Sequence, residues 1–240
     1  MRLLVINANT SSGVTELCAA AARRAATPGT EIVPLTCAFG PTIIESRVEN
    51  AIAAHAVLDQ VAQHRERADA ILLAVSYDTA LAAARDLAGC PVVGITQASF
   101  ATAALIGSRI GLVTFGTPWL YRELADAYGA TARLAGIEVI PASARDAYSD
   151  PDRVRQIAAQ TAGRLVTQAE ADVVILCGAA FAGMAQAIQP DVPVPLIDGV
   201  TCGTRLCEVL AAMHLPSRAV ATGPGGIGLS PALTGALYGH

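Results

Sequence analysis

The chain of 240 residues is predicted to have an α/β fold of two pseudo-symmetric lobes, each a parallel βαβ sheet flanked by helices. Two segments repeat each other, ADAILLAV at 68–75 and ADVVILCG at 171–178, and each precedes a second apolar run, at 91–95 and 193–197. The repeated segments have the length of strands buried on both faces of a parallel sheet, and they end in small residues. Because open α/β sheets bind ligands at the carboxyl ends of their strands, we expect a site between the lobes, where these two segments end.

The first half alternates strand and helix, which is the pattern of βαβ units. Residues 9–11 follow the first strand with side chains that can cap a helix, and the Pro-Gly pair at 28–29 ends that helix. A Gly-Pro turn at 40–41 separates the second strand from a long helix. The expected strands are 2–7, 31–36, 69–75 and one that begins at Pro91, and the expected helices are 13–26, 45–66, 78–88 and 97–107.

The second half restarts the same alternation at residue 110. The expected strands are 110–114, 137–140, 172–177 and 193–197, and the expected helices are 118–135, 151–169, 181–188 and 201–213. A tail rich in glycine and proline ends the chain. We expect residues 1–100, joined by the C-terminal segment 205–240, to form the first lobe and residues 101–204 to form the second.

The composition excludes several classes of partner. Hydrophobic residues make up 53% of the chain and charged residues 15%, the net charge is −4, and no block of lysine or arginine occurs. We therefore expect a small-molecule substrate and no nucleic acid. No apolar stretch reaches about 18 residues, and the chain enters a strand at once rather than a signal peptide. We expect a cytoplasmic protein that contacts no membrane, and we expect it to form a homo-oligomer.

Six cysteines and four histidines raise the question of a disulfide or a metal site. No two cysteines form a Cys-x-x-Cys pair, and the histidines lie apart from the cysteines, so the sequence predicts no metal site. Most of the cysteines are expected to be reduced, small core residues. The glycine-rich segment 223–228 lies in the tail rather than between a strand and a helix, which argues against a nucleotide site.

Several short motifs together resemble a known family, the hydantoin and allantoin racemases of the aspartate/glutamate racemase superfamily. The similar segments, at matching spacing, are INANTS at 6–11, GPTIIES at 40–46, the strand at 68–75 with Asp78 and Arg85 after it, PVVGI at 91–95, and Asp198 with Gly199. The resemblance spans nearly the whole chain. It implies an active site in the cleft between two lobes and an enzyme that uses no cofactor. In such enzymes one cysteine stands on each side of the stereocentre, and one thiolate removes the α-proton while the opposite thiol returns one.

The chain departs from this family at the two catalytic positions. Each catalytic cysteine of the family lies six residues after the aspartate that opens its strand, but here these positions hold Val75, after Asp69, and Gly178, after Asp172. Neither residue can transfer a proton. Cys177 lies one position early, where an extended strand turns the side chain to the opposite face, although the permissive backbone at Gly178 can bring it back. Cys177 is therefore either a catalytic thiol or a buried core residue.

Polar residues at the predicted strand ends complete the candidate site. Inversion of a carbon requires a base on one face, an acid on the other, and donors that stabilise an enolate. We predict catalytic roles for Cys177, Ser76 and Asp78, with helix capping as the alternative for Asp78 and turn hydrogen bonding for Ser76. Tyr121 is expected to pack in the core. The predicted substrate-binding residues are Asn9, Thr10, Ser11, Val75, Tyr77, Thr114, Gly178 and Ala179.

Three functions remain open on the sequence alone. The resemblance favours a cofactor-independent racemase or epimerase of cyclic amides such as hydantoins or allantoin. The loss of both cysteines at the family positions favours a decarboxylase, ring-opening hydrolase or lyase on the same scaffold. A catalytically silent small-molecule binder is the third possibility, because a fold does not fix a function.

Overall fold

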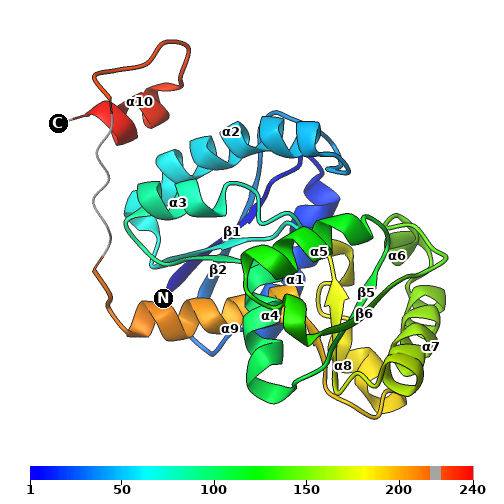
Figure 1. The fold of residues 1–240 in the computed structure, drawn as a ribbon. Helices are drawn as coiled ribbons and strands as arrows, with labels where there is room; N and C mark the ends of the chain where they lie inside the picture. Colours follow the sequence, from blue (N-terminus) through cyan, green and yellow to red (C-terminus); the bar gives the residue numbers. More distant parts are fainter. Residues whose placement is uncertain (217–222, 240) are drawn as a thin grey trace.

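A computed structural model describes residues 1–216 and 223–239, and within these residues it contains two four-stranded sheets whose strand pairs are all parallel. The strand order is β2-β1-β3-β4 in the first sheet and β6-β5-β7-β8 in the second. The second order repeats the first, offset by four strands, and the two sheets form separate lobes (Figure 1). The prediction of two pseudo-symmetric parallel lobes is confirmed.

The first sheet forms as the apolar runs predict, with helices between the strands. The helix α2 begins at a capping box, in which Ser46 accepts a hydrogen bond from the Glu49 backbone N–H and the Glu49 side chain accepts one from the Ser46 backbone. The third strand ends at Leu73, earlier than expected, and the chain then turns through left-handed backbone at Asp78 and Ala80. The elements are β1 (Arg2–Asn7), α1 (Ser12–Ala25), β2 (Glu31–Thr36), α2 (Arg47–His64), η1 (Arg65–Arg67), β3 (Ala70–Leu73), α3 (Leu81–Ala88), β4 (Val92–Gly94) and α4 (Ile95–Ile106).

The second sheet repeats this plan, with strands and helices again in alternation. The helix expected over 118–135 ends at Ala127, because Gly129 takes a left-handed φ of 68° and the chain turns toward the next strand. The tail contains one further helix, α10, which packs on α2. The elements are β5 (Ile110–Thr114), α5 (Pro118–Ala127), η2 (Thr131–Arg133), β6 (Leu134–Val139), α6 (Asp146–Ser149), α7 (Pro151–Ala169), β7 (Val173–Cys177), η3 (Ala179–Phe181), α8 (Ala185–Ile188), η4 (Gln189–Asp191), β8 (Leu196–Asp198), α9 (Gly199–Ala212) and α10 (Pro231–Tyr238).

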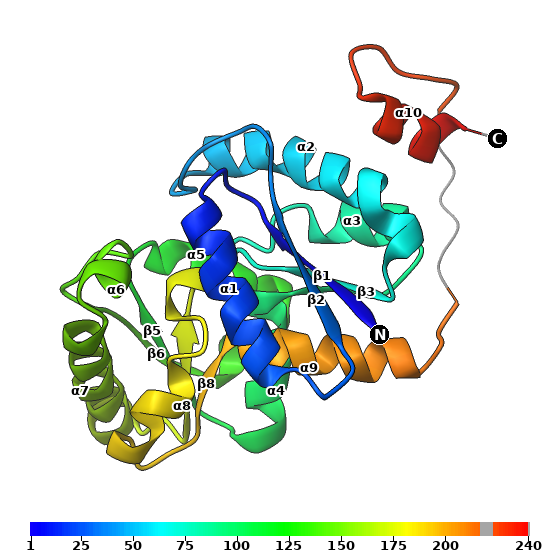
Figure 2. The same cartoon turned by 180° about the vertical axis from the view of Figure 1, so that it is seen from behind.

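Two helices cross between the lobes and hold them together. The helix α4 follows β4 of the first sheet and packs against β7 and β8 of the second, whereas α9 follows β8 and packs against β3 and β4. The two helices also pack against each other. Figure 2 shows α9 beside α1 on one face of the first sheet, and Figure 1 shows α2 and α3 on the other face. Each lobe thus supplies a helix that covers the sheet of the other.

The central strands β1, β3, β5 and β7 are almost completely buried, as expected for parallel sheets that are covered on both faces, whereas the edge strands β2 and β6 are only partly buried. One apolar cluster contains residues of β1 and β3 together with residues of β5 and β7, so the hydrophobic core is continuous between the lobes. Among residues 1–216 and 223–239, no helix combines the length and the apolar character needed to span a bilayer.

Candidate active site

The carboxyl ends of β3 and β7 meet between the lobes and place Ser76 beside Gly178. A Cβ atom added at Gly178 would lie 3.2 Å from Ser76 Oγ and 3.6 Å from the Tyr121 hydroxyl oxygen. Gly178 has a φ of 111°, which residues with a side chain rarely adopt. Thr114, at the end of β5, is the register partner of Cys177 on β7. We call these five residues the strand-end cluster: Ser76, Thr114, Tyr121, Cys177 and Gly178.

Cys177 lies at the end of β7 with its thiol enclosed. The residue is 5% exposed, its Sγ lies 3.7 Å from the Ile175 carbonyl oxygen, and burial raises the pKa of the thiol well above its usual range. A cavity of about 10 Å³, the size of one water molecule, separates the end of β7 from Thr96 and Phe100 of α4. In this arrangement Cys177 carries its proton, and it lies where the two lobes meet.

Tyr121 places a buried hydroxyl group near Cys177 and the ends of β5 and β7. It is 2% exposed, and burial together with the neighbouring Cys177 raises the pKa of its phenol, while hydrogen bonding with the Ser76 and Thr114 side chains acts in the opposite direction. Our expectation that Tyr121 only packs in the core therefore missed its contacts with polar groups. The sequence could have indicated that Tyr121 lies near the strand ends, because it belongs to the first turn of a helix that starts four residues after the end of β5.

Asp78 is buried, and its carboxylate lies against the first turn of α4. It accepts hydrogen bonds from the backbone N–H groups of Thr96 (3.0 Å) and Gln97 (2.7 Å) and from the Tyr128 hydroxyl (2.7 Å). Burial raises the pKa of this carboxyl from 3.8 to about 6, against the lowering effect of the three donors. Asp78 was predicted to cap the helix that follows it in the sequence. In the structure its carboxylate instead binds backbone N–H groups in the first turn of α4. The Tyr128 bond joins the first lobe to the second.

Asn9, Thr10 and Ser11 lie in a partly exposed loop at the end of β1. Asn9 Oδ1 accepts hydrogen bonds from the Ser11 backbone N–H (2.9 Å) and from Asn7 Nδ2 (2.8 Å), and the Thr10 backbone N–H donates to the Pro41 carbonyl (3.1 Å). Ser11 is the N-terminal cap residue of α1, yet its side chain makes no capping bond. The loop is therefore ordered by Asn7 and Asn9, and the Ser11 hydroxyl is not used for capping.

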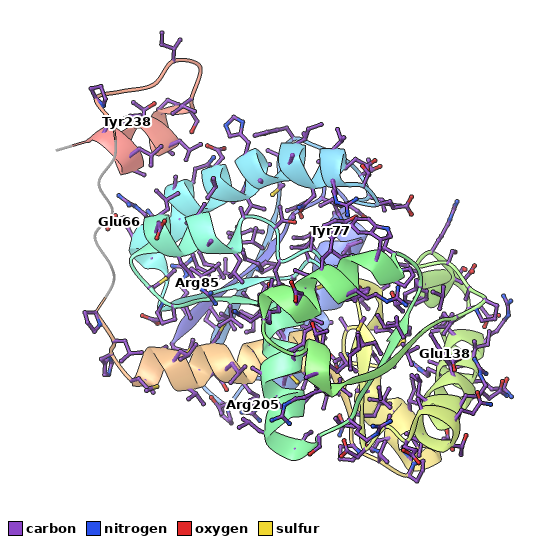
Figure 3. All side chains as sticks on the ribbon, viewed as in Figure 1. Glu66, Tyr77, Arg85, Glu138, Arg205 and Tyr238 are labelled. Carbon is purple, nitrogen blue, oxygen red and sulfur yellow. The ribbon has the colours of Figure 1, made fainter. Side chains whose placement is uncertain are left out.

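Aromatic and charged side chains join the lobes in what we call the mouth contact: Tyr77, Arg47, Trp119 and Glu123. The rings of Tyr77 and Trp119 meet edge to face with centroids 6.0 Å apart, and the Arg47 guanidinium lies 4.1 Å from the centre of the Trp119 ring. Arg47 of α2 also forms an ion pair with Glu123 of α5. Figure 3 shows Tyr77 where the first lobe approaches α5. The Tyr77 hydroxyl is buried and has no hydrogen-bond partner within the described residues.

The two remaining predicted residues provide backbone and apolar surface. Val75 is 6% exposed and belongs to the core cluster that contains Cys177, and Ala179 opens the short helix η3. Within residues 1–216 and 223–239, no three His, Cys, Asp or Glu side chains gather at a spacing suited to a metal ion.

The mouth contact is weak enough to open, because an exposed ion pair and a cation–π contact contribute about 1 kcal/mol each or less. We expect Arg47→Ala to increase the exposure of Trp119, the only tryptophan of the chain, measured as acrylamide quenching of its fluorescence. Arg23→Ala, which removes an exposed arginine of α1 outside the mouth contact, is the control and should leave quenching unchanged. Equal quenching in the two variants would show that Arg47 does not hold the lobes together.

The comparisons with known proteins cover most of this chain and both of its lobes. The family model described as Asp/Glu/Hydantoin racemase matches residues 3–207. The chain belongs to the Asp/Glu/hydantoin racemase family. It is 30% identical to a hydantoin racemase of Pseudomonas sp. (strain NS671), over 88% of this chain and 86% of that protein, and 30% identical to a hydantoin racemase of Paenarthrobacter aurescens, over 89% and 92%. These relatives confirm the resemblance described from the sequence motifs.

Solved structures of the racemase family have the same fold. An allantoin racemase from Klebsiella pneumoniae superposes with a TM-score of 0.91 at 30% identity, and the match covers 98% of this chain and 99% of that one. An arylmalonate decarboxylase superposes with a TM-score of 0.66 at 17% identity, over 91% and 96% of the chains, and this likeness shows the fold alone. Family membership makes this chain an enzyme of the racemase family.

Proposed function

We propose that this protein is a cofactor-independent racemase or epimerase that acts on the stereocentre of a hydantoin-like or allantoin-like cyclic amide. The observation that carries the proposal is the full-length match to racemases combined with proton-bearing groups from both lobes that meet at the strand ends. Ser76 comes from the first lobe, and Cys177 and Tyr121 come from the second. A site between lobes is suited to inversion, because it can address both faces of one carbon.

Proton transfer at the stereocentre is assigned to Cys177 and to the Ser76–Tyr121 pair. The Cys177 thiolate removes the α-proton from one face, and the electrons pass into the ring carbonyl to give an enolate, which the Thr114 hydroxyl stabilises as a donor. From the first lobe, the Ser76 hydroxyl returns a proton on the other face and takes one from the Tyr121 phenol beside it. Solvent then gives a proton back to the phenolate and accepts the proton that the Cys177 thiol has taken up, which restores the starting state. Asp78 acts as a positioning residue, because its carboxylate holds the first turn of α4 and the Tyr128 hydroxyl.

Substrate binding requires the lobes to separate. The cavity beside Cys177 has a volume of about 10 Å³, which is far smaller than a five-membered ring. Since burial is the cause of the raised thiol pKa, opening of the cleft also brings that pKa back toward the range in which a thiolate forms. Opening of the mouth contact then controls both the access of the substrate to Cys177 and the ionisation of the Cys177 thiol.

A non-racemising reaction is the second candidate, and one observation favours it. Val75 stands at one of the two positions where the family resemblance places a cysteine, and it is buried in the apolar core. With no thiol on the Val75 side, a proton is transferred to only one face of the substrate carbon. Decarboxylation and ring opening need no more than this, whereas racemisation needs both faces.

The two candidates differ in their hydrogen exchange in D₂O. We expect incubation with each enantiomer of 5-substituted hydantoins and of allantoin to give deuterium at the stereocentre together with loss of optical rotation. Exchange without inversion, release of CO₂ or ring opening would contradict the racemase and support the second candidate. Absence of any reaction, in protein whose folding is verified by circular dichroism, would contradict both. Heat-treated protein is the control, because allantoin and hydantoins also exchange slowly without an enzyme.

A further inference from the structure

The buried hydroxyl of Tyr77 has no hydrogen-bond partner within residues 1–216 and 223–239. The residue is 8% exposed, and a tyrosine hydroxyl that is buried usually finds a partner. The other unpartnered buried side-chain atoms of the described chain are the Nε atoms of Arg2 and Arg155, whose guanidinium groups form ion pairs. Tyr77 therefore presents a polar group for which the described chain supplies no partner.

Carboxylates near the Tyr77 phenol are engaged elsewhere. Glu49 is held in the capping box of α2 with Ser46. Glu123 pairs with Arg47 in the mouth contact. Burial is the main cause that raises the pKa of the Tyr77 phenol, and Glu49 adds to it, so the hydroxyl keeps its proton at neutral pH. The hydroxyl is thus a free donor, and an acceptor from outside the chain can pair with it.

Tyr77 lies between the mouth contact and the strand-end cluster. It follows Ser76 in the chain, and its ring meets that of Trp119, which precedes Tyr121 by two residues on α5. Tyr77, Tyr121 and Cys177 belong to the same apolar cluster. Figure 3 shows Tyr77 where the first lobe approaches α5. A substrate that enters through the mouth contact and reaches Cys177 therefore lies beside the Tyr77 side chain.

A ring of the hydantoin or allantoin type presents two carbonyl groups. One is bonded to the stereocentre and becomes the enolate, for which Thr114 is the assigned donor. The other stands between the two ring nitrogens, on the side of the ring away from the stereocentre. When the stereocentre lies at the strand-end cluster, between Ser76 and Cys177, this second carbonyl is directed toward the mouth contact, where Tyr77 lies.

We propose that Tyr77 is a specificity-determining residue, whose hydroxyl donates to the carbonyl oxygen between the two ring nitrogens of the bound substrate. The inference rests on the proposed function for the identity of the ligand, and it names a residue and a substrate atom that the proton transfer does not use. A buried donor that pairs with the substrate rejects a ring without the acceptor, because the donor then stays unpaired. The selected class is therefore cyclic ureides, in preference to their thio analogues.

The test compares 5-benzylhydantoin with 5-benzyl-2-thiohydantoin, in which sulfur, a weaker acceptor, replaces the oxygen between the ring nitrogens. Calorimetric titration of the full chain with each racemic compound measures affinity, and a racemic ligand leaves a racemase with no net reaction. We expect the wild type to bind the hydantoin about tenfold more tightly than the thio compound, and Tyr77→Phe to bind the two within about twofold of each other. The change in this ratio cancels differences in ring size and acidity, which are the same for both proteins.

Tyr148→Phe is the matched control. It removes an exposed hydroxyl of α6, outside the mouth contact and the strand-end cluster, and it should keep the ratio of the wild type. Tyr77→Phe should unfold at the same Tm as the wild type or higher, because it removes a buried hydroxyl that has no partner. A lower Tm would show that the hydroxyl is bonded within the chain and would overturn the inference.

The binding ratio and the D₂O incubation separate this inference from the proposed function. A ratio in Tyr77→Phe equal to that of the wild type would overturn the role of Tyr77, even where racemisation is observed. Binding of neither compound to the wild type, or equal binding of both, would also overturn it. A ratio that falls in Tyr77→Phe without any racemisation would support the Tyr77 contact and contradict the racemase.

Discussion

Replacement of Cys177 by alanine is expected to lower kcat by about a thousand-fold on the most rapidly converted hydantoin or allantoin substrate, because a positioned proton carrier contributes roughly 10² to 10⁴ in rate. The substitution removes only one sulfur atom from a buried site, so we expect a loss of about 1 kcal/mol in the free energy of unfolding. In a chain of this size such a loss lowers Tm by about 2 to 4 °C. Steady-state kinetics and thermal unfolding monitored by circular dichroism measure the two effects separately.

Cys202→Ala is the matched control for this experiment. Cys202 is also buried, in α9, and it lies outside the strand-end cluster. It should show a similar small loss of stability and a kcat close to that of the wild type. A Cys177→Ala enzyme with kcat within threefold of the wild type would assign Cys177 to the core and leave the proton transfer to Ser76 and Tyr121.

Replacement of Asp78 is expected to change how stability depends on pH. The pKa of the folded-state carboxyl is raised from 3.8 to about 6, so the folded state binds this proton more tightly than the unfolded state. The stability that this group contributes is therefore present below about pH 4 and is lost as the pH rises through about 6. A shift of about two units corresponds to about 3 kcal/mol. We expect the wild type to lose that amount between pH 4 and pH 7.5, measured by urea unfolding.

Asp78→Asn should lack this loss and should also be less stable than the wild type at pH 4. The amide group places an NH₂ where Gln97 and Tyr128 donate, or leaves those donors unpaired, which costs about 1 to 3 kcal/mol. Asp86→Asn, at an exposed position on α3, is the control and should retain the pH dependence of the wild type. A pH dependence in Asp78→Asn equal to that of the control would show that the Asp78 carboxyl does not titrate in this range.

The positions of the strand ends could be predicted from the sequence because they follow from local patterns. The repeated runs at 68–75 and 171–178 have the apolar character of buried parallel strands, and such strands align their carboxyl ends at one edge of a sheet. Ser76 and Gly178 follow the ends of β3 and β7, so their meeting was expected from the repeat, and the structure places them side by side. Thr114 at the end of β5 belongs to the same edge for the same reason.

Residues whose partners come from another element were predicted less well. Asp78 was expected to act in the site or to cap the helix that follows it, yet its carboxylate holds the first turn of α4, eighteen residues away, and the Tyr128 hydroxyl of the other lobe. Tyr121 was expected in the core, and it is buried, but it also approaches Ser76 and Thr114. Neither contact leaves a periodic pattern in the sequence, because each depends on how a helix is placed against a strand end.

The sequence by itself determined the α/β class, the two lobes with parallel sheets, and the family to which the chain is similar. These properties depend on apolar periodicity and on short motifs, which are local in the chain. The tertiary structure alone decided which hydroxyl groups lie near Cys177 and that Asp78 joins the lobes through Tyr128. These contacts join residues that are far apart in the chain, and they arise because α4 and α9 each cross from one lobe to cover the sheet of the other.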